Sequence, residues 1–137
     1  MSALAITWFG HATFVVTTPG GKRIVFDPWL TNPKAPAGAK IDKADVICVT
    51  HGHSDHTTDV LPVARGTGAP VVAVFELANY FQSKGVKDVV PMGSGGTAIS
   101  PAFADAFDPA FARTYRWEAL STGRRRRGWI KRRANRA

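Results

Sequence analysis

The chain has 137 residues, of which 45% are hydrophobic and 20% are charged, and this composition fits one globular domain and excludes a wholly disordered chain. Its net charge of +8 belongs mainly to one end, because residues 1–98 hold 8 Lys or Arg against 7 Asp or Glu, whereas residues 99–137 hold 10 against 3. The single cysteine excludes an internal disulfide framework, and no stretch approaches the roughly 18–20 apolar residues of a membrane span, so we expect a cytoplasmic protein with no membrane partner.

The first part of the chain predicts three short strands. Residues 4–9 form an apolar run that ends at Gly10, and residues 13–17 are rich in β-branched and aromatic side chains. Residues 23–27 repeat this character after a Pro-Gly-Gly-Lys turn at 19–22. We expect the second and third strands to pair as an antiparallel hairpin.

Alternating strands and helices are expected next. An aperiodic loop at 28–40 precedes the continuous apolar run 45–50, which is typical of a strand covered on both faces. A short helix at 58–65, closed by Gly66 or Gly68, follows it.

The same alternation continues to the end of the patterned region. Residues 70–75 predict another buried strand, 76–84 a helix with Gly85 at its C-terminal end, and 89–90 the start of a further strand. Hairpins followed by strand–helix–strand indicate one half of a layered α/β sandwich.

This pattern stops near residue 97. Residues 98–111 are mostly Ala, Phe, Pro and Asp without periodicity, and residues 123–133 are an Arg-rich run that no core could bury. We therefore divide the chain into a partial domain, 1–97, and an irregular basic tail, 98–137. Two explanations of the tail stay open: a frameshifted or replaced segment, and a genuine but divergent C-terminal segment.

Four good metal ligands lie within six residues in the run Thr-His-Gly-His-Ser-Asp-His at 50–56. Because His51 and His53 are two apart in a loop, both imidazoles can reach one ion. Asp55 and His56 are adjacent and can serve a second ion nearby. Imidazole and carboxylate are the ligands that zinc-type ions take in catalytic sites. The alternative is a polar loop whose histidines only cap a helix.

This loop resembles the His-x-His-x-Asp-His signature of the metallo-β-lactamase superfamily. Residues 8–14, 26–30, 74–80 and 91–97 look like further motifs of its poorly characterised bacterial metal-dependent hydrolases. The resemblance covers roughly residues 4–97 and implies the N-terminal portion of an αββα sandwich, a site for one or two zinc-type ions and hydrolysis of a small-molecule substrate.

Carried over to this chain, the resemblance implies that His51 and His53 bind the first ion and that Asp55 and His56 bind the second. Water activated by the ions would attack an ester, amide or phosphoester, and Asp55 would take up its proton. His11 and Asp27 are further candidates for the catalytic site. Their alternatives are a histidine that caps the preceding turn and an Asx-turn residue.

The family completes its site with a further His, a bridging Asp and a final His from the second half of the fold. This chain has no histidine after His56, and neither Asp105 nor Asp108 has a context that resembles the bridging motif. The resemblance therefore leaves two protein ligands per ion, where a catalytic zinc keeps three. We expect an incomplete hydrolase, for which activity and inactivity both stay open, and whose sheet lacks its second layer.

Two other functions stay open. The Arg cluster at 124–133, with Trp117 and Trp129 as stacking groups, would suit nucleic-acid binding, although we favour a solvated or mistranslated tail. The second possibility is an inert fragment that neither folds nor binds. The oligomeric state is undetermined.

Overall fold

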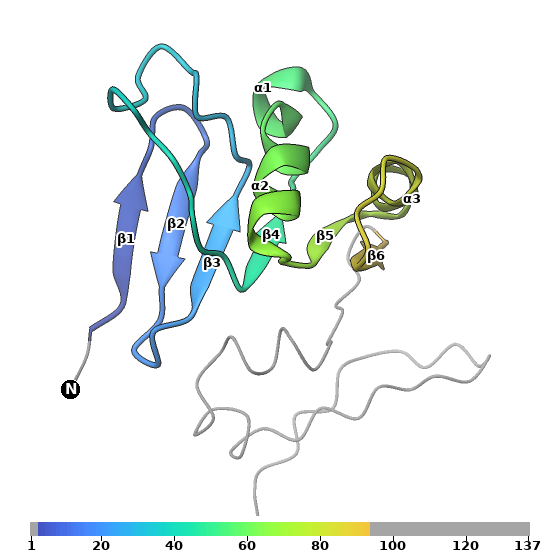
Figure 1. The fold of residues 1–137 in the computed structure, drawn as a ribbon, viewed down its shortest axis with the longest axis horizontal. Helices are drawn as coiled ribbons and strands as arrows, with labels where there is room; N and C mark the ends of the chain where they lie inside the picture. The colour runs from blue at the N-terminus through green and yellow to red at the C-terminus, as the bar shows by residue number, and fades with distance from the viewer. Residues whose placement is uncertain (1–2, 94–137) are drawn as a thin grey trace, which may run out of the picture.

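The computed structural model describes residues 3–93, which form a six-stranded mixed sheet with helices on one face (Figure 1). The strands are β1 (Ala5–Trp8), β2 (Phe14–Thr17), β3 (Arg23–Phe26), β4 (Val46–Cys48), β5 (Val71–Val74) and β6 (Val89–Met92). The helices are α1 (Ser54–Thr57), α2 (Val60–Thr67) and α3 (Phe75–Ser83). The tail, 98–137, with its Arg cluster, lies outside the described residues.

The strands follow one another across the sheet in chain order. β1, β2 and β3 pair antiparallel, and β3, β4, β5 and β6 pair parallel. The expected hairpin of β2 and β3 is confirmed, with Val15 opposite Val25. Because β1 runs in the same direction as β3 and β4, the carboxyl ends of these three strands lie at one edge of the sheet.

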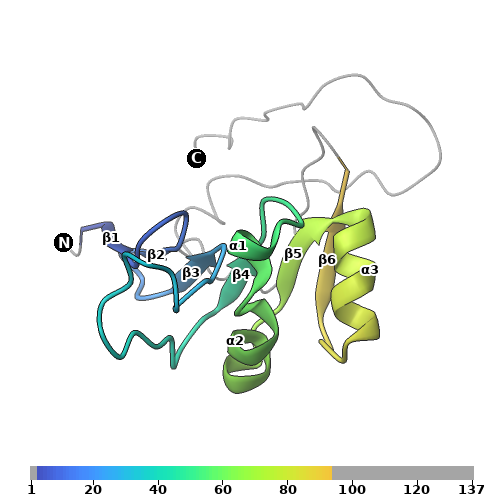
Figure 2. The same cartoon turned by 90° about the horizontal axis from the view of Figure 1, so that it is seen from above.

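The main core lies between one face of the sheet and the helices α2 and α3 (Figure 2). It contains the buried side chains of Val15, Val25, Ile41, Ile47, Val49, Val60, Val63, Ala64, Ala69, Val71, Ala73, Ala78, Phe81 and Val86. Side chains alternate across each strand, so the central strands β3, β4 and β5 contribute apolar residues to both faces.

The opposite face of the sheet is also apolar. Ile24, Val46 and Val72 are buried there and form a second cluster. Near β1 the same face is open: Ile6 is 62% exposed and Trp8 is 54% exposed. This apolar face agrees with the expected half of a two-sheet sandwich.

Several element boundaries differ from the expectation by one or two residues, and the larger differences lie around the histidine loop and at the end of β5. The helix expected at 58–65 is observed as α2, Val60–Thr67, and Gly68, one of the two glycines expected to close it, does so with a φ of 71°. The short helix α1, Ser54–Thr57, was not expected. Phe75 begins α3 instead of ending β5. β4 stops at Cys48, short of residue 50, because the Thr50 N–H donates to the Asp27 carboxylate instead of continuing the ladder.

In the described part of the chain, none of the helices has the length and apolar character needed to cross a membrane.

Asp45 joins the start of β3 to the strand beside it. Its N–H donates to the Arg23 carbonyl at 2.8 Å, and its Oδ2 accepts the Arg23 N–H at 2.8 Å. Burial opposes ionisation of this carboxyl, but the Arg23 N–H and the Lys22 ammonium together hold the pKa of Asp45 below its ordinary value.

Because its pKa is lowered in the folded state, the Asp45 carboxylate stabilises the fold at pH values above the ordinary pKa of aspartate. This contribution is lost as the pH falls through the folded-state pKa. We expect Asp45→Asn to lower the free energy of unfolding by about 1 kcal/mol at pH 7, since Lys22 is exposed and screened. The free energy of unfolding of Asp45→Asn and of the unmodified chain is measured in urea at pH 7 and at about pH 3. A difference between the two proteins that is the same at both pH values would contradict the prediction.

Cys48 is half-buried beside the second apolar cluster. Burial, together with the nearby charge of Asp27, raises the pKa of its thiol to about 11. At pH 8 its thiolate fraction should therefore be roughly two hundredfold below that of an ordinary cysteine. Because Cys48 is the chain's single cysteine, a disulfide reagent reports on it alone: slow labelling should become fast in urea, and equal rates would contradict the assignment.

Candidate metal centre

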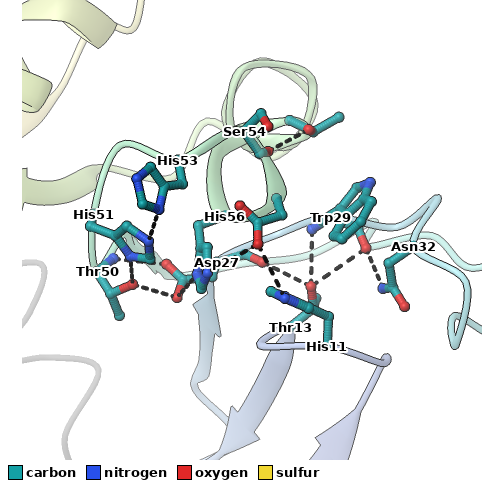
Figure 3. Close-up of polar contacts among 12 residues, drawn as sticks. His11, Thr13, Asp27, Trp29, Asn32, Thr50, His51, His53, Ser54 and His56 are labelled. Atoms are coloured by element: carbon teal, nitrogen blue, oxygen red, sulfur yellow. Dashed lines mark hydrogen bonds and ion pairs between the residues drawn. The ribbon is translucent and has the colours of Figure 1, made fainter.

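The predicted ligands gather at the sheet edge where β1, β3 and β4 end (Figure 3). His11 lies in the turn after β1, and Asp27 directly follows β3. The loop that carries His51 and His53 follows β4, and α1 carries His56. Three segments that are far apart in the sequence thus supply one cluster.

Asp27 is the buried centre of the cluster. Its φ of 42° lies in the left-handed region, which is strained for a residue with a side chain. Its Oδ1 accepts the Thr50 N–H at 2.7 Å, and its Oδ2 accepts the Thr50 hydroxyl at 2.7 Å. The Thr13 hydroxyl holds this segment by donating to the Asp27 carbonyl at 2.8 Å. Asp27 therefore joins the ends of β3 and β4.

The same carboxylate orients His56. His56 Nδ1 lies 2.9 Å from Asp27 Oδ2, and since a carboxylate only accepts, the imidazole places its proton on Nδ1. The lone pair of neutral His56 is then on Nε2, which lies 3.6 Å from Asp55 Oδ2. A carboxylate behind an imidazole is the arrangement that prepares histidine for a metal.

Thr50 orients His51 in a similar way. Its hydroxyl proton is used on Asp27, so its oxygen accepts a proton from His51 Nδ1, 3.0 Å away. His51 Nε2 then carries a lone pair and faces His53 Nδ1 at 2.9 Å. The ring centroids of His51 and His56 are 4.0 Å apart, so the His51–His53 pair and the His56–Asp55 pair belong to one cluster.

The turn that holds His11 is tightly built. Gly10 has a φ of 91° and packs against Asn32, whose Nδ2 donates to the Phe9 carbonyl at 2.9 Å. His11 has a φ of 49°, and its Nε2 lies 3.2 Å from Asp55 Oδ2. Its ring also packs against Trp29 in a T-shaped contact, with 5.3 Å between the ring centroids.

The donor set fits a zinc-type ion. One ligand atom from each of His11, Asp55 and His56 lies within 4.8 Å of the others. Ligand atoms on a tetrahedral ion, at bond lengths of about 2.0–2.1 Å, lie about 3.3 Å apart. His51 Nε2 and His53 Nδ1, at 2.9 Å, need to separate by only a few tenths of an ångström to share an ion.

The structure brings together all six residues that the sequence singled out. They are His11, Asp27, His51, His53, Asp55 and His56. The alternative of a capping loop has no support, because His53 occupies the N-cap position of α1 without a side-chain cap hydrogen bond. The Asx-turn alternative for Asp27 is not seen either, since both carboxylate oxygens bond to Thr50.

Two residues of the site were missed from the sequence, Thr13 and Thr50. Thr50 immediately precedes the first histidine, at the end of the expected strand, and this position was a usable signal. Thr13 is fully buried, with its hydroxyl between the Asp27 carbonyl and the Trp29 N–H. Nothing in its sequence context marks it.

Comparison with known proteins gives consistent matches to one group. Residues 5–95 match the family model described as "Beta-lactamase superfamily domain". A UPF0173 metal-dependent hydrolase of Rubrobacter xylanophilus is 54% identical over 95 residues, which are 68% of this chain and 39% of that protein. One of Solibacter usitatus is 47% identical over 95 residues, 69% of this chain and 41% of that protein.

A solved structure is similar as well. A metallo hydrolase of the hyperthermophilic archaeon Ignicoccus hospitalis superposes with a TM-score of 0.62 at 32% identity, over 70% of this chain and 42% of that one. The present chain therefore spans about two fifths of the length of these similar proteins.

Proposed function

This chain belongs to the metallo-β-lactamase superfamily, and from that premise we propose that it is a metal-dependent hydrolase. The observation that carries the proposal is how Asp27 and Thr50 contact the two histidines, with Asp27 Oδ2 2.9 Å from His56 Nδ1 and the Thr50 hydroxyl 3.0 Å from His51 Nδ1. Because both Nδ1 atoms are engaged in this way, the Nε2 atoms of His51 and His56 face the other ligands, His53 and Asp55.

In the proposal, His51 and His53 hold one ion, and Asp55 and His56 hold a second. The metal is zinc, bound as one or two ions, because imidazole and carboxylate are its ligands in catalytic sites. When bound, such an ion lowers the pKa of water toward neutrality and polarises the bond that is cleaved.

The protein's own residues position and deprotonate the reactants. Asp55 is 40% exposed, which leaves its carboxylate accessible to a water molecule whose proton it takes up. Asp27 is buried and does not reach substrate; it keeps the His56 ring in place. His11 lies beside Asp55 with a 37% exposed side chain.

The proposed substrate is a small molecule with an ester, amide or phosphoester bond, and we place the reaction in the cytoplasm. All three bond types suit an activated water beside a Lewis acid, so the residues described select none of them. The alternative of nucleic-acid binding through residues 124–133 concerns residues outside the described part.

The test is hydrolysis of chromogenic esters, lactams and phosphodiesters by the full chain after chelation and after addition of Zn²⁺. We expect activity only with the metal, and a loss of at least about 100-fold in His53→Ala, with no loss in Gln82→Ala on the exposed side of α3. Activity that resists chelation, or survives in His53→Ala, would refute the proposal.

A further inference from the structure

We propose that His11 is a third protein ligand, through Nε2, of the ion held by Asp55 and His56. This inference rests on the metal-dependent function proposed above and extends it to a residue in the turn between β1 and β2. With His11, the described residues alone supply three ligands to one ion, which is the number that a catalytic zinc keeps.

The three ligand atoms are spaced for one ion. Asp55 Oδ2 lies 3.2 Å from His11 Nε2 and 3.6 Å from His56 Nε2. Both distances are close to the separation of about 3.3 Å between neighbouring ligands of a tetrahedral zinc. One atom from each residue lies within 4.8 Å of the other two, so a single ion can contact all three.

The contacts of His56 also suit a cation at this place. The proton of neutral His56 is on Nδ1, toward Asp27, so its Nε2 presents a lone pair to the carboxylate of Asp55. Two electron-rich atoms that face each other repel unless the positive charge of a proton or a metal ion lies between them. A metal ion supplies that charge and also accepts a lone pair from His11.

The turn is built to hold His11 in this place. Among residues 3–93, the non-glycine residues with positive φ are His11 and Asp27, and both belong to the cluster. The Trp8 indole N–H donates to the His11 carbonyl at 2.9 Å and fixes the turn from the side of β1. Strained backbone that persists at a cluster of ligands is typical of a functional site, because elsewhere it would only cost stability.

The test is metal binding by the full chain, with Co²⁺ and Zn²⁺ as the probes. The variants are His11→Asn and His11→Gly, because both residues tolerate the left-handed backbone and neither supplies an imidazole. Co²⁺ is followed by its visible absorption, and Zn²⁺ by competition with a chromophoric chelator. Urea unfolding of the metal-free variants reports whether the fold is kept.

We expect both variants to fold and to bind the ion at least about 100-fold more weakly than the unmodified chain, since even a residue behind a ligand contributes about 10- to 100-fold. We also expect a change in the Co²⁺ absorption band, which a residue acting only on substrate would not cause. Unchanged affinity and spectrum in both variants would overturn the role of His11 and leave the proposed hydrolase standing. Absence of metal binding by the unmodified chain would overturn both.

Discussion

Asp27→Asn should weaken Zn²⁺ binding by about 10- to 100-fold and lower the free energy of unfolding by about 2 kcal/mol. Asparagine keeps the size of the side chain and tolerates the φ of 42°, so the backbone is not the cause. The cause is the amide N–H that replaces a carboxylate oxygen. It cannot accept from both Thr50 and His56, as Asp27 Oδ2 does at 2.7 and 2.9 Å.

The loss in metal affinity has a specific origin. An amide N–H opposite His56 Nδ1 makes that atom an acceptor, and the ring proton then moves to Nε2, where it blocks the ion. The free energy of unfolding is measured in urea without metal, and affinity by chelator competition. Asp42→Asn, at a largely exposed carboxylate, is the matched control for the loss of one charge. Equal behaviour of the two variants would show that Asp27 does not orient His56.

The sequence predicted the fold well where the pattern is regular. The continuous apolar run at 45–50 correctly indicated a central strand, because a strand covered on both faces needs no polar side. The turn at 19–22 correctly indicated a hairpin, since Gly21 adopts a φ of 81° there. Phe75 was placed wrongly because β5 passes into α3 without a connecting loop.

The site was partly predictable for a different reason. Spacing alone suggested that His51 and His53 share an ion, since both lie in one short loop. The approach of His11 to Asp55, however, depends on β1 and β4 ending at the same edge of the sheet, and on a strained turn. The role of Thr50 depends on where a single hydroxyl proton points. Neither long-range approach nor proton direction is encoded in a local pattern.

Gly10→Ala should destabilise the fold by about 3 kcal/mol or more, whereas Gly85→Ala should cost about 1 kcal/mol. The two glycines have nearly the same φ, 91° and 92°, so the backbone strain of an added Cβ is matched. Only at Gly10 would the Cβ also collide: it would lie 2.7 Å from the Lys34 carbonyl carbon and 2.9 Å from the Ala35 nitrogen, and would overlap Asn32. In the described part of the chain, nothing lies within 4 Å of the same position at Gly85.

Comparing Gly10→Ala with Gly85→Ala separates an effect on the stability of the fold from an effect on metal binding. Relief of the collision at Gly10 must move the turn away from Asn32, and His11 moves with it because it is the next residue. If His11 binds the ion, Gly10→Ala should therefore weaken Co²⁺ binding at urea concentrations where the variant is still folded, and Gly85→Ala should not. Similar losses of stability in both variants would mean that the turn at Gly10 can shift at little cost. That result would contradict the claim that tight packing of this turn holds His11 beside Asp55. A large loss of stability with unchanged Co²⁺ affinity would instead show that the turn supports the sheet and not the metal centre.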